Sequence, residues 1–189
     1  MDILIKNGNI YDGVNAPFIG DVAIADGKIA EVGNINAEAA QIIDARGKCV
    51  TPGFIDIHRH ADMAAFRPSF GEAELMQGLT TIINGNCGMG PAPVEKGSGL
   101  EGYLRPVLGE MLPMADICTT AGYMKSLERI SLPLNIGMLT GCGTIWAGIL
   151  GYGGRHPDDN DFARFHSILE RELSAGTLGV SLGLGYAPE

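Results

Sequence analysis

Two histidines, His58 and His60, stand two positions apart at the end of a short apolar segment, residues 54–57, which is typical of a buried parallel strand. Successive side chains of an extended strand point to opposite faces, so both imidazoles would emerge on one face while Arg59 points away. Neutral imidazole is a good nitrogen ligand for a borderline metal such as zinc. The spacing therefore predicts a metal site, and the alternative is a pair of core or surface histidines that are neighbours by chance. Because two ligands do not complete even a catalytic zinc site, a third must come from elsewhere.

Cys87 is the candidate for that third ligand. It follows a second apolar segment, residues 79–84, and lies between Gly85 and Gly88, which permit a close approach of the backbone. If the two apolar segments are neighbouring parallel strands, Cys87 lies at the same end of the sheet as the histidines. Its thiolate would be stabilised by the metal that it binds. The residues by themselves leave a buried structural thiol equally open.

The other cysteines carry weaker signals. Cys142 follows a third apolar segment, about residues 134–140, and can be a ligand, a pocket thiol or an inert residue. Cys49 and Cys118, which precede a strand and begin a helix, are interpreted as structural. The four cysteines show no Cys-x-x-Cys spacing, which excludes a zinc ribbon and a thioredoxin motif.

Residues 1–50 are expected to form short strands joined by turns, in a small antiparallel β layer. Asp26-Gly27 between two apolar runs is a hairpin signal, because both central positions of a type I′ turn need a positive φ. Asn7-Gly8 is interpreted as an earlier turn that ends the first strand at Lys6. A layer of this size cannot close a core alone and must pack on another part of the protein.

From residue 51 onward, strands alternate with helices, which predicts parallel pairing through crossover helices. The helix expected over 160–174 places apolar side chains on one face, and this stripe is interpreted as packing: Phe162, Phe165, Ile168, Leu169 and Leu173. Four strand–helix units are about half of an eightfold barrel. The predicted fold class is therefore α/β, a partial (β/α)8 TIM barrel with a small N-terminal β-sandwich layer, divided into domains 1–50 and 51–189. The expected strands are 54–57, 79–84, 134–140 and 178–182, and the expected helices are 72–77, 119–130 and 160–174.

Composition limits the class of protein. The chain is 46% hydrophobic and 19% charged, which is typical of a folded domain and not of a disordered tail. Its formal net charge of -9, with scattered basic residues, argues against nucleic acid and anionic membranes as partners. The amino terminus lacks the pattern of a secretory signal, so a cytoplasmic location is expected. Residues 130–154 carry no charge, but their seven glycines predict a buried strand with a Gly-rich loop instead of a membrane helix.

Three stretches resemble a known family. Residues 50–62, Val-Thr-Pro-Gly-Phe-Ile-Asp-Ile-His-Arg-His-Ala-Asp, are similar to the first-strand motif of the amidohydrolase superfamily. Residues 77–88, with the cysteine motif, and residues 175–188 resemble the N-acyl-D-amino-acid deacylases, the D-aminoacylase branch, in their N-terminal portion. The resemblance implies a zinc-dependent hydrolase that cleaves the amide bond of N-acyl-D-amino acids, in a (β/α)8 barrel flanked by a small β layer.

The resemblance also assigns roles to residues. It implies that His58 and His60 are metal ligands and that Cys87 is the thiolate ligand, where other amidohydrolases use a carboxylated lysine. Tyr186 would contact the substrate, or else pack in its loop. Two further histidine ligands and the general-base aspartate are expected beyond Glu189. Cys142 stands where similar sequences usually carry a histidine, which alters the pocket wall.

Two other functions stay open. A cyclic-amide hydrolase of the dihydropyrimidinase type is the second enzyme hypothesis, although Cys87 in place of a strand lysine speaks against it. A non-catalytic fragment or a subunit that needs a partner is the third. The isolated chain is expected to be inactive, because half a barrel leaves edge strands unpaired and promotes association. A complementing segment or a homo-oligomer would complete it, with a small-molecule N-acyl amino acid as substrate.

Overall fold

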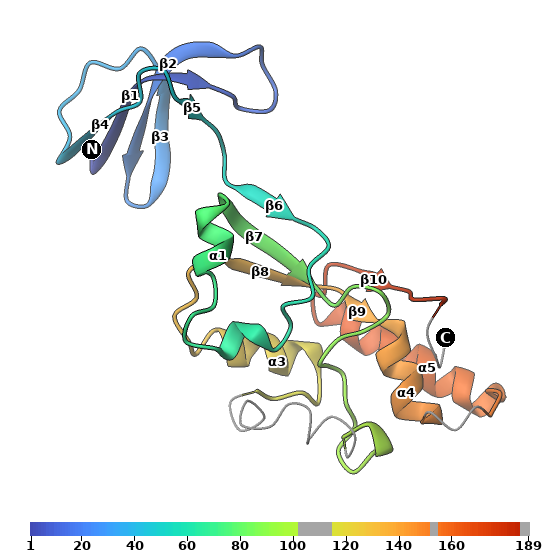
Figure 1. Cartoon of the computed structure of the whole chain (residues 1–189). Helices are drawn as coiled ribbons and strands as arrows, with labels where there is room; N and C mark the ends of the chain where they lie inside the picture. The colour runs from blue at the N-terminus through green and yellow to red at the C-terminus, as the bar shows by residue number, and fades with distance from the viewer. Residues whose placement is uncertain (102–114, 152–154, 186–189) are drawn as a thin grey trace. The chain divides into compact units, whose positions relative to one another are not determined.

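The computed structural model describes residues 1–101, 115–151 and 155–185 (Figure 1). These residues form two compact units, Met1–Gly53 and Phe54–Glu189. The first unit is a five-stranded sheet, and the second contains short parallel sheets with helices, so the chain is a mixed α/β protein. The assignment of these units to a sandwich layer and to half a barrel stays a prediction.

The sheet of the first unit is mixed, which corrects the expectation of an antiparallel layer. Its central strand pairs antiparallel with the second strand but parallel with the fourth and fifth. The chain crosses over the sheet after the third strand, and the crossover packs Ile35 against Leu4 and Ala23. A crossover returns the chain in the same direction, so the pairing that follows it is parallel. The strands are β1 (Ile3–Ile10), β2 (Phe18–Ala25), β3 (Lys28–Gly33), β4 (Gln41–Asp44) and β5 (Cys49–Val50).

Two predicted turns of this unit have different outcomes. Asp26 and Gly27 have φ values of 52° and 69°, as the hairpin between β2 and β3 requires. The turn expected at Asn7-Gly8 is wrong, because β1 continues to Ile10. Asn7 instead has a φ of 60° inside the strand, where the register with β2 shifts. A bulge absorbs the extra residue without ending the strand.

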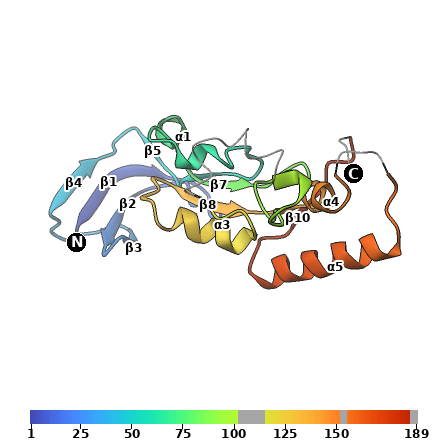
Figure 2. The same ribbon diagram turned by 90° about the horizontal axis from the view of Figure 1, so that it is seen from below.

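In the second unit, three strands form a parallel sheet in the order β6-β7-β8, and two further strands, β9 and β10, pair in parallel. Figure 2 shows α3 lying along one side of the three-stranded sheet. The strands are β6 (Phe54–Asp56), β7 (Leu79–Asn84), β8 (Asn135–Met138), β9 (Thr140–Gly141) and β10 (Val180–Ser181). The helices are the 3₁₀ helix η1 (Ala64–Phe66), α1 (Glu72–Met76), α3 (Thr120–Leu127), α4 (Cys142–Leu150) and α5 (Asp159–Ser174).

The largest buried apolar cluster among the described residues of this unit packs around α3. Tyr123 and Leu127 of α3 are completely buried and share a cluster with Met138 of β8 and Ala147 of α4. Burying side chains of this size removes enough apolar area from water to hold helix and sheet together. The cluster comprises Ala65, Phe66, Ala92, Val94, Leu100, Ala115, Ile117, Tyr123, Leu127, Met138 and Ala147.

The uncharged stretch 130–154 differs from its prediction. Residues 142–150 form the helix α4, where a Gly-rich loop was expected. Ile145 and Ala147 are buried there, and this packing offsets the cost of about 1 kcal/mol that each interior glycine brings to a helix. Over the ranges that the structure describes, no helix is both long and apolar enough to cross a membrane.

The long helix α5 is close to its prediction but differs at its start and on its apolar face. Its N-cap is Asp158, whose side chain accepts hydrogen bonds from the amides of the first turn, and Asp161 completes a capping box. Of the predicted stripe, Ile168 is buried and Phe165 stacks on Trp146 of α4 with ring centroids 4.4 Å apart. Phe162, which also meets Trp146 edge-on, is 45% exposed, and Leu173 is 43% exposed.

The apolar segment that precedes the histidines was expected to be buried, and this expectation is wrong for the described chain. Phe54 is 56% exposed and Ile55 is 62% exposed. The strand β6 pairs with β7 alone among the described strands, so it is an edge of its sheet. Parallel strands are normally covered on both faces, so this exposure marks surface that a further segment could cover.

Candidate metal centre

The structure brings together the three residues that the sequence singled out as metal ligands. One donor atom from each of His58, His60 and Cys87 lies within 4.8 Å of the others. The Nε2 atom of His58 is 3.2 Å from the Sγ atom of Cys87, and the two imidazole centroids are 5.6 Å apart. Two ligands of one tetrahedral zinc, at about 2.1 Å for nitrogen and about 2.3 Å for sulfur, are about 3.6 Å apart. The donors therefore need only small shifts to share one ion.

The two strands that carry these residues explain their convergence. The histidines follow β6 and Cys87 follows β7, and the two strands are parallel neighbours. Their carboxyl ends therefore meet at one edge of the sheet. The pairing extends beyond β6, because the amide of Arg59 donates to the carbonyl oxygen of Ile83 at 3.0 Å. This bond aligns the histidine segment with the start of the cysteine loop, which we define as residues 85–90.

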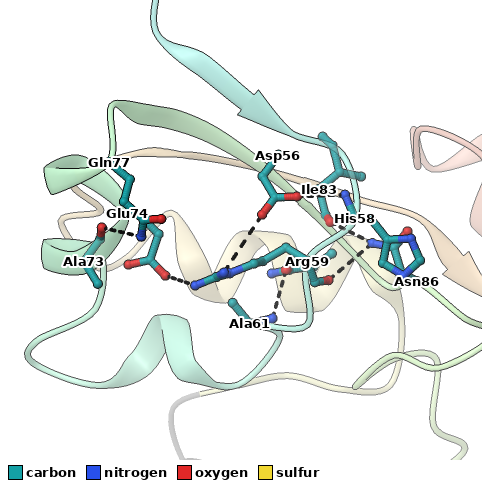
Figure 3. A network of polar contacts seen from close by, with 10 residues as sticks. Asp56, His58, Arg59, Ala61, Ala73, Glu74, Gln77, Ile83 and Asn86 are labelled. Carbon is teal, nitrogen blue, oxygen red and sulfur yellow. Dashed lines mark hydrogen bonds and ion pairs between the residues drawn. The ribbon is translucent and has the colours of Figure 1, made fainter.

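Arg59, between the two histidines, anchors this segment on the opposite side. Figure 3 shows its guanidinium directed toward Glu74 of α1 and Asp56 of β6. Its Nη2 atom contacts Glu74, whose side chain is only 8% exposed. The carbonyl oxygen of Arg59 accepts a hydrogen bond from Asn86 Nδ2 at 3.2 Å. Both the backbone and the side chain of this residue are therefore held, which fixes the strand end from which the imidazoles project.

The cysteine loop lies very close to the backbone of β9 and the residue before it. A Cβ atom on Gly85 would lie 2.1 Å from the carbonyl oxygen of Leu139, and one on Gly141 would lie 2.5 Å from that of Gly88. Only glycine fits at both places, because a side chain would require the opposing backbone to shift, which costs more free energy than the movement of a flexible side chain. Cys87 itself has a φ of 56°, in the left-handed region that non-glycine residues rarely occupy. The surrounding structure must therefore hold this conformation.

Hydrogen bonds from three other segments hold the loop. The amide of Gly85 donates to Asp62 Oδ1 at 2.9 Å, and the amide of Gly88 donates to Ser181 Oγ at 2.9 Å. Thr144 of α4 contributes at the far end, where its hydroxyl accepts from the amide of Gly90 at 2.8 Å. The loop is thus tied to the histidine segment, to β10 and to α4 at once.

The partly buried Asp62, two positions after His60, forms a pair with the buried Tyr123 of α3. Burial raises the pKa of the Asp62 carboxyl above its usual range, and the hydrogen bond from the Gly85 amide opposes this shift. The hydroxyl of Tyr123 donates to the carbonyl oxygen of Asp62, and burial followed by the nearby Asp62 charge raises the pKa of Tyr123. This pair connects the metal-ligand edge to the core under α3.

The donors themselves face solvent. His58 and His60 are exposed and Cys87 is half-buried, so a small molecule can approach the three donor atoms. Catalytic zinc sites keep such access, with three protein ligands and an open position, whereas structural sites are closed by four ligands. The donor set of two imidazoles and one thiol also fits a borderline metal.

Two further residues were singled out in the sequence. Tyr186 lies outside the described residues. Cys142 is the first residue of α4, is 4% exposed, and does not belong to the group of donors. Sequence reasoning missed Ser181, Thr144 and Glu74, because each acts through a contact with a residue distant in the sequence. Short motifs do not record such contacts.

Part of the chain matches a family model, and nearly all of it is similar to known proteins. Residues 41–108 match the family model described as Amidohydrolase family. The N-acyl-D-aspartate deacylase of Alcaligenes xylosoxydans xylosoxydans is 31% identical over 191 residues, which cover 99% of this chain and 37% of that protein. The chain is therefore homologous to the N-acyl-D-amino-acid deacylases over nearly its whole length, as the resemblance of its motifs predicted.

Solved structures agree with this relationship. A crystal structure of N-acyl-D-glutamate deacylase from Bordetella bronchiseptica, in complex with zinc and a phosphonate inhibitor, has a TM-score of 0.85 and 30% identity. A D-aminoacylase variant in complex with copper chloride has a TM-score of 0.84 and 27% identity. Each comparison covers 99% of this chain and 39% of the other. The chain thus spans little more than a third of the length of these relatives.

Proposed function

We propose that the protein containing this chain is a metal-dependent hydrolase that cleaves the amide bond of N-acyl-D-amino acids. The observation that carries this proposal is the convergence of His58, His60 and Cys87 at the carboxyl edge of two parallel strands. The homology to deacylases of N-acyl-D-aspartate and N-acyl-D-glutamate supports the substrate class. Zinc is the proposed metal, supported by the donor set and by the zinc complex of one relative.

In this proposal the three side chains hold the ion. The imidazoles of His58 and His60 must be neutral and Cys87 must be a thiolate to bind, so metal uptake would release protons. A bound zinc ion supplies Lewis-acid polarisation of the amide carbonyl and activation of water. Arg59 stays outside this chemistry, because its guanidinium is directed to Glu74 and Asp56. The exposed side of the donor group leaves room for the substrate.

We also propose that β6 to β10 belong to a (β/α)8 barrel that further segments complete. The exposed apolar residues of β6 and the exposed Leu182 and Leu184 support this, because apolar side chains exposed together usually mark a surface that another segment buries. Tyr186 would line the substrate pocket, and the general-base aspartate would lie on a later strand. The 189 residues alone are then expected to associate and to lack activity. A monomer in light scattering that turns over substrate would contradict this part of the proposal.

The experiment combines metal binding with substrate turnover. The complete protein that contains this chain is purified, stripped with a chelator, titrated with zinc, and assayed for release of the free amino acid from N-acetyl-D-aspartate, N-acetyl-D-glutamate and their L enantiomers. Wild type should need the metal and favour the D forms. The variants His58→Ala and Cys87→Ser should lose zinc binding and turnover.

Matched controls separate loss of ligands from general damage. His156 is exposed, and among the contacts of the described residues its one hydrogen bond uses its backbone, so His156→Ala should keep metal and activity. Cys49→Ser, at an exposed free thiol of the first unit, serves the same purpose. Metal-independent turnover, or full zinc binding by both ligand variants, would refute the proposed function.

A further inference from the structure

The hydroxyl of Ser181 spans the cysteine loop on both sides of Cys87. It donates a hydrogen bond to the carbonyl oxygen of Gly85 and accepts one from the amide of Gly88 at 2.9 Å. These two groups stand two positions before and one position after the thiol. Ser181 comes from β10, 93 residues further along the chain than Gly88, so the contact is entirely tertiary.

Cys87 requires such support. Its φ of 56° is a left-handed conformation, which an L residue other than glycine adopts at an energetic cost. A conformation of this kind persists only where the surroundings impose it. The Ser181 hydroxyl bonds to Gly85 before Cys87 and to Gly88 after it, so it limits the movement of both ends of the segment 85–88. Because the backbone fixes the Cα–Cβ bond, this restriction also sets the direction of Cβ, from which Sγ reaches the donor group.

The neighbouring contacts do not replace this role. Thr144 bonds to the loop at Gly88 and Gly90, after the thiol, and Asp62 bonds only to Gly85, before it. Ser181 alone among these three side chains bonds on both sides of Cys87. It pairs through the backbone with Gly141 of β9, which itself approaches Gly88 too closely for a side chain. The hydroxyl is therefore held firmly against the loop.

We propose that Ser181 is a positioning residue of the metal site, and that its hydroxyl aims the Cys87 thiolate at the ion shared with His58 and His60. This inference rests on the proposed function, because it assumes that Cys87 is a ligand. Residues that orient metal ligands through hydrogen bonds typically change metal affinity by about 10- to 100-fold when they are mutated. Ser181→Ala should therefore bind metal at least about tenfold more weakly than wild type.

Cobalt(II) is the probe, because a cobalt–thiolate bond gives a charge-transfer absorption band that reports on the sulfur ligand directly. The dissociation constant is measured by competition with a chelator. Wild type should show the band and Cys87→Ser should not. Ser181→Ala should weaken both the band and the affinity. Thr and Val have nearly the same shape and differ in the hydroxyl, so Ser181→Thr should retain the band and Ser181→Val should lose it, even if the alanine variant does not fold.

Ser126 provides a matched control for stability. Its hydroxyl also accepts one backbone hydrogen bond, from Asp116 at 2.8 Å, and donates another, to Gly122 at 3.0 Å, but it lies in α3. Ser126→Ala should lower the melting temperature without changing cobalt affinity. An equal loss of affinity in Ser126→Ala, or equal behaviour of the Thr and Val variants, would overturn the inference. A wild-type protein without the Cys87-dependent band would instead refute the proposed ligand set itself.

Discussion

The ion pair between Arg59 and Glu74 allows a quantitative test of how the histidine segment is held. Two substitutions, Glu74→Gln and Arg59→Gln, remove the same pair but leave different groups behind. The Glu74 side chain is 8% exposed and that of Arg59 is 37% exposed. A guanidinium left alone can therefore reach water and keeps Asp56 at 4.0 Å, whereas a carboxylate left alone stays buried.

The expected magnitudes follow from this asymmetry. A hydrogen bond to a charged group contributes about 1.5–3 kcal/mol, and partial exposure of Arg59 reduces it, so Glu74→Gln should cost about 1–2 kcal/mol. Removal of one partner of a fully buried pair costs about 3–5 kcal/mol, so Arg59→Gln should cost about 2–4 kcal/mol. The double variant should cost less than the sum of the two single variants, because the uncompensated carboxylate is then absent.

Urea unfolding at neutral pH, followed by circular dichroism, measures all four proteins of this cycle. The free energies of unfolding give the order of the two single variants and the coupling between them. Metal affinity is measured in parallel, since a looser histidine segment should also bind zinc more weakly. A larger loss for Glu74→Gln than for Arg59→Gln, or a coupling near zero, would refute the reasoning that a buried carboxylate depends on Arg59.

Two other predictions concern the core and the pH dependence. Tyr123→Phe removes the hydrogen bond to the carbonyl oxygen of Asp62 and should lower the free energy of unfolding by about 1–2 kcal/mol in the same urea assay. Arg155 lowers the pKa of Asp161 below its usual 3.8, so the stabilisation by this carboxylate is present above about pH 4 and is lost as pH falls through the lowered pKa. Asp161→Asn should therefore melt below wild type at pH 7, and the gap should narrow in melting curves recorded toward pH 3.

Controls for these two predictions use exposed residues of the same types. Tyr11 is 40% exposed, and its hydroxyl meets only the exposed side chain of Asn9 among the described contacts, so Tyr11→Phe should be nearly neutral. If Tyr11→Phe lowered the free energy of unfolding as much as Tyr123→Phe, the loss in Tyr123→Phe could not be assigned to its buried hydrogen bond. Asp159 is exposed in the first turn of the same helix, and Asp159→Asn should show a smaller gap than Asp161→Asn. A gap for Asp161→Asn that widens as the pH falls would contradict the assigned sign.

The sequence determined those features that depend on local rules. The alternation of side chains along an extended segment predicted that His58 and His60 lie close together, and the parallel pairing of neighbouring strands predicted Cys87 at the same edge. The structure brings the three donor atoms together there. The positive φ values demanded by Asp26-Gly27 gave the hairpin, and helical spacing gave α5. The motifs also predicted the relationship to N-acyl-D-amino-acid deacylases, which the comparisons confirm.

Only the tertiary structure decided how these parts are supported. The hydrogen bond between Ser181 and Gly88 joins residues 93 positions apart, and Arg59 forms an ion pair with Glu74 on another element. No local sequence pattern predicts either contact. The helix at residues 142–150 forms against its glycine content, because packing of Ile145 outweighs intrinsic propensity. The exposure of β6 likewise depends on which strands lie beside it and not on its own apolar residues. Periodicity is a property of neighbours along the chain, whereas burial and anchoring are properties of neighbours in space.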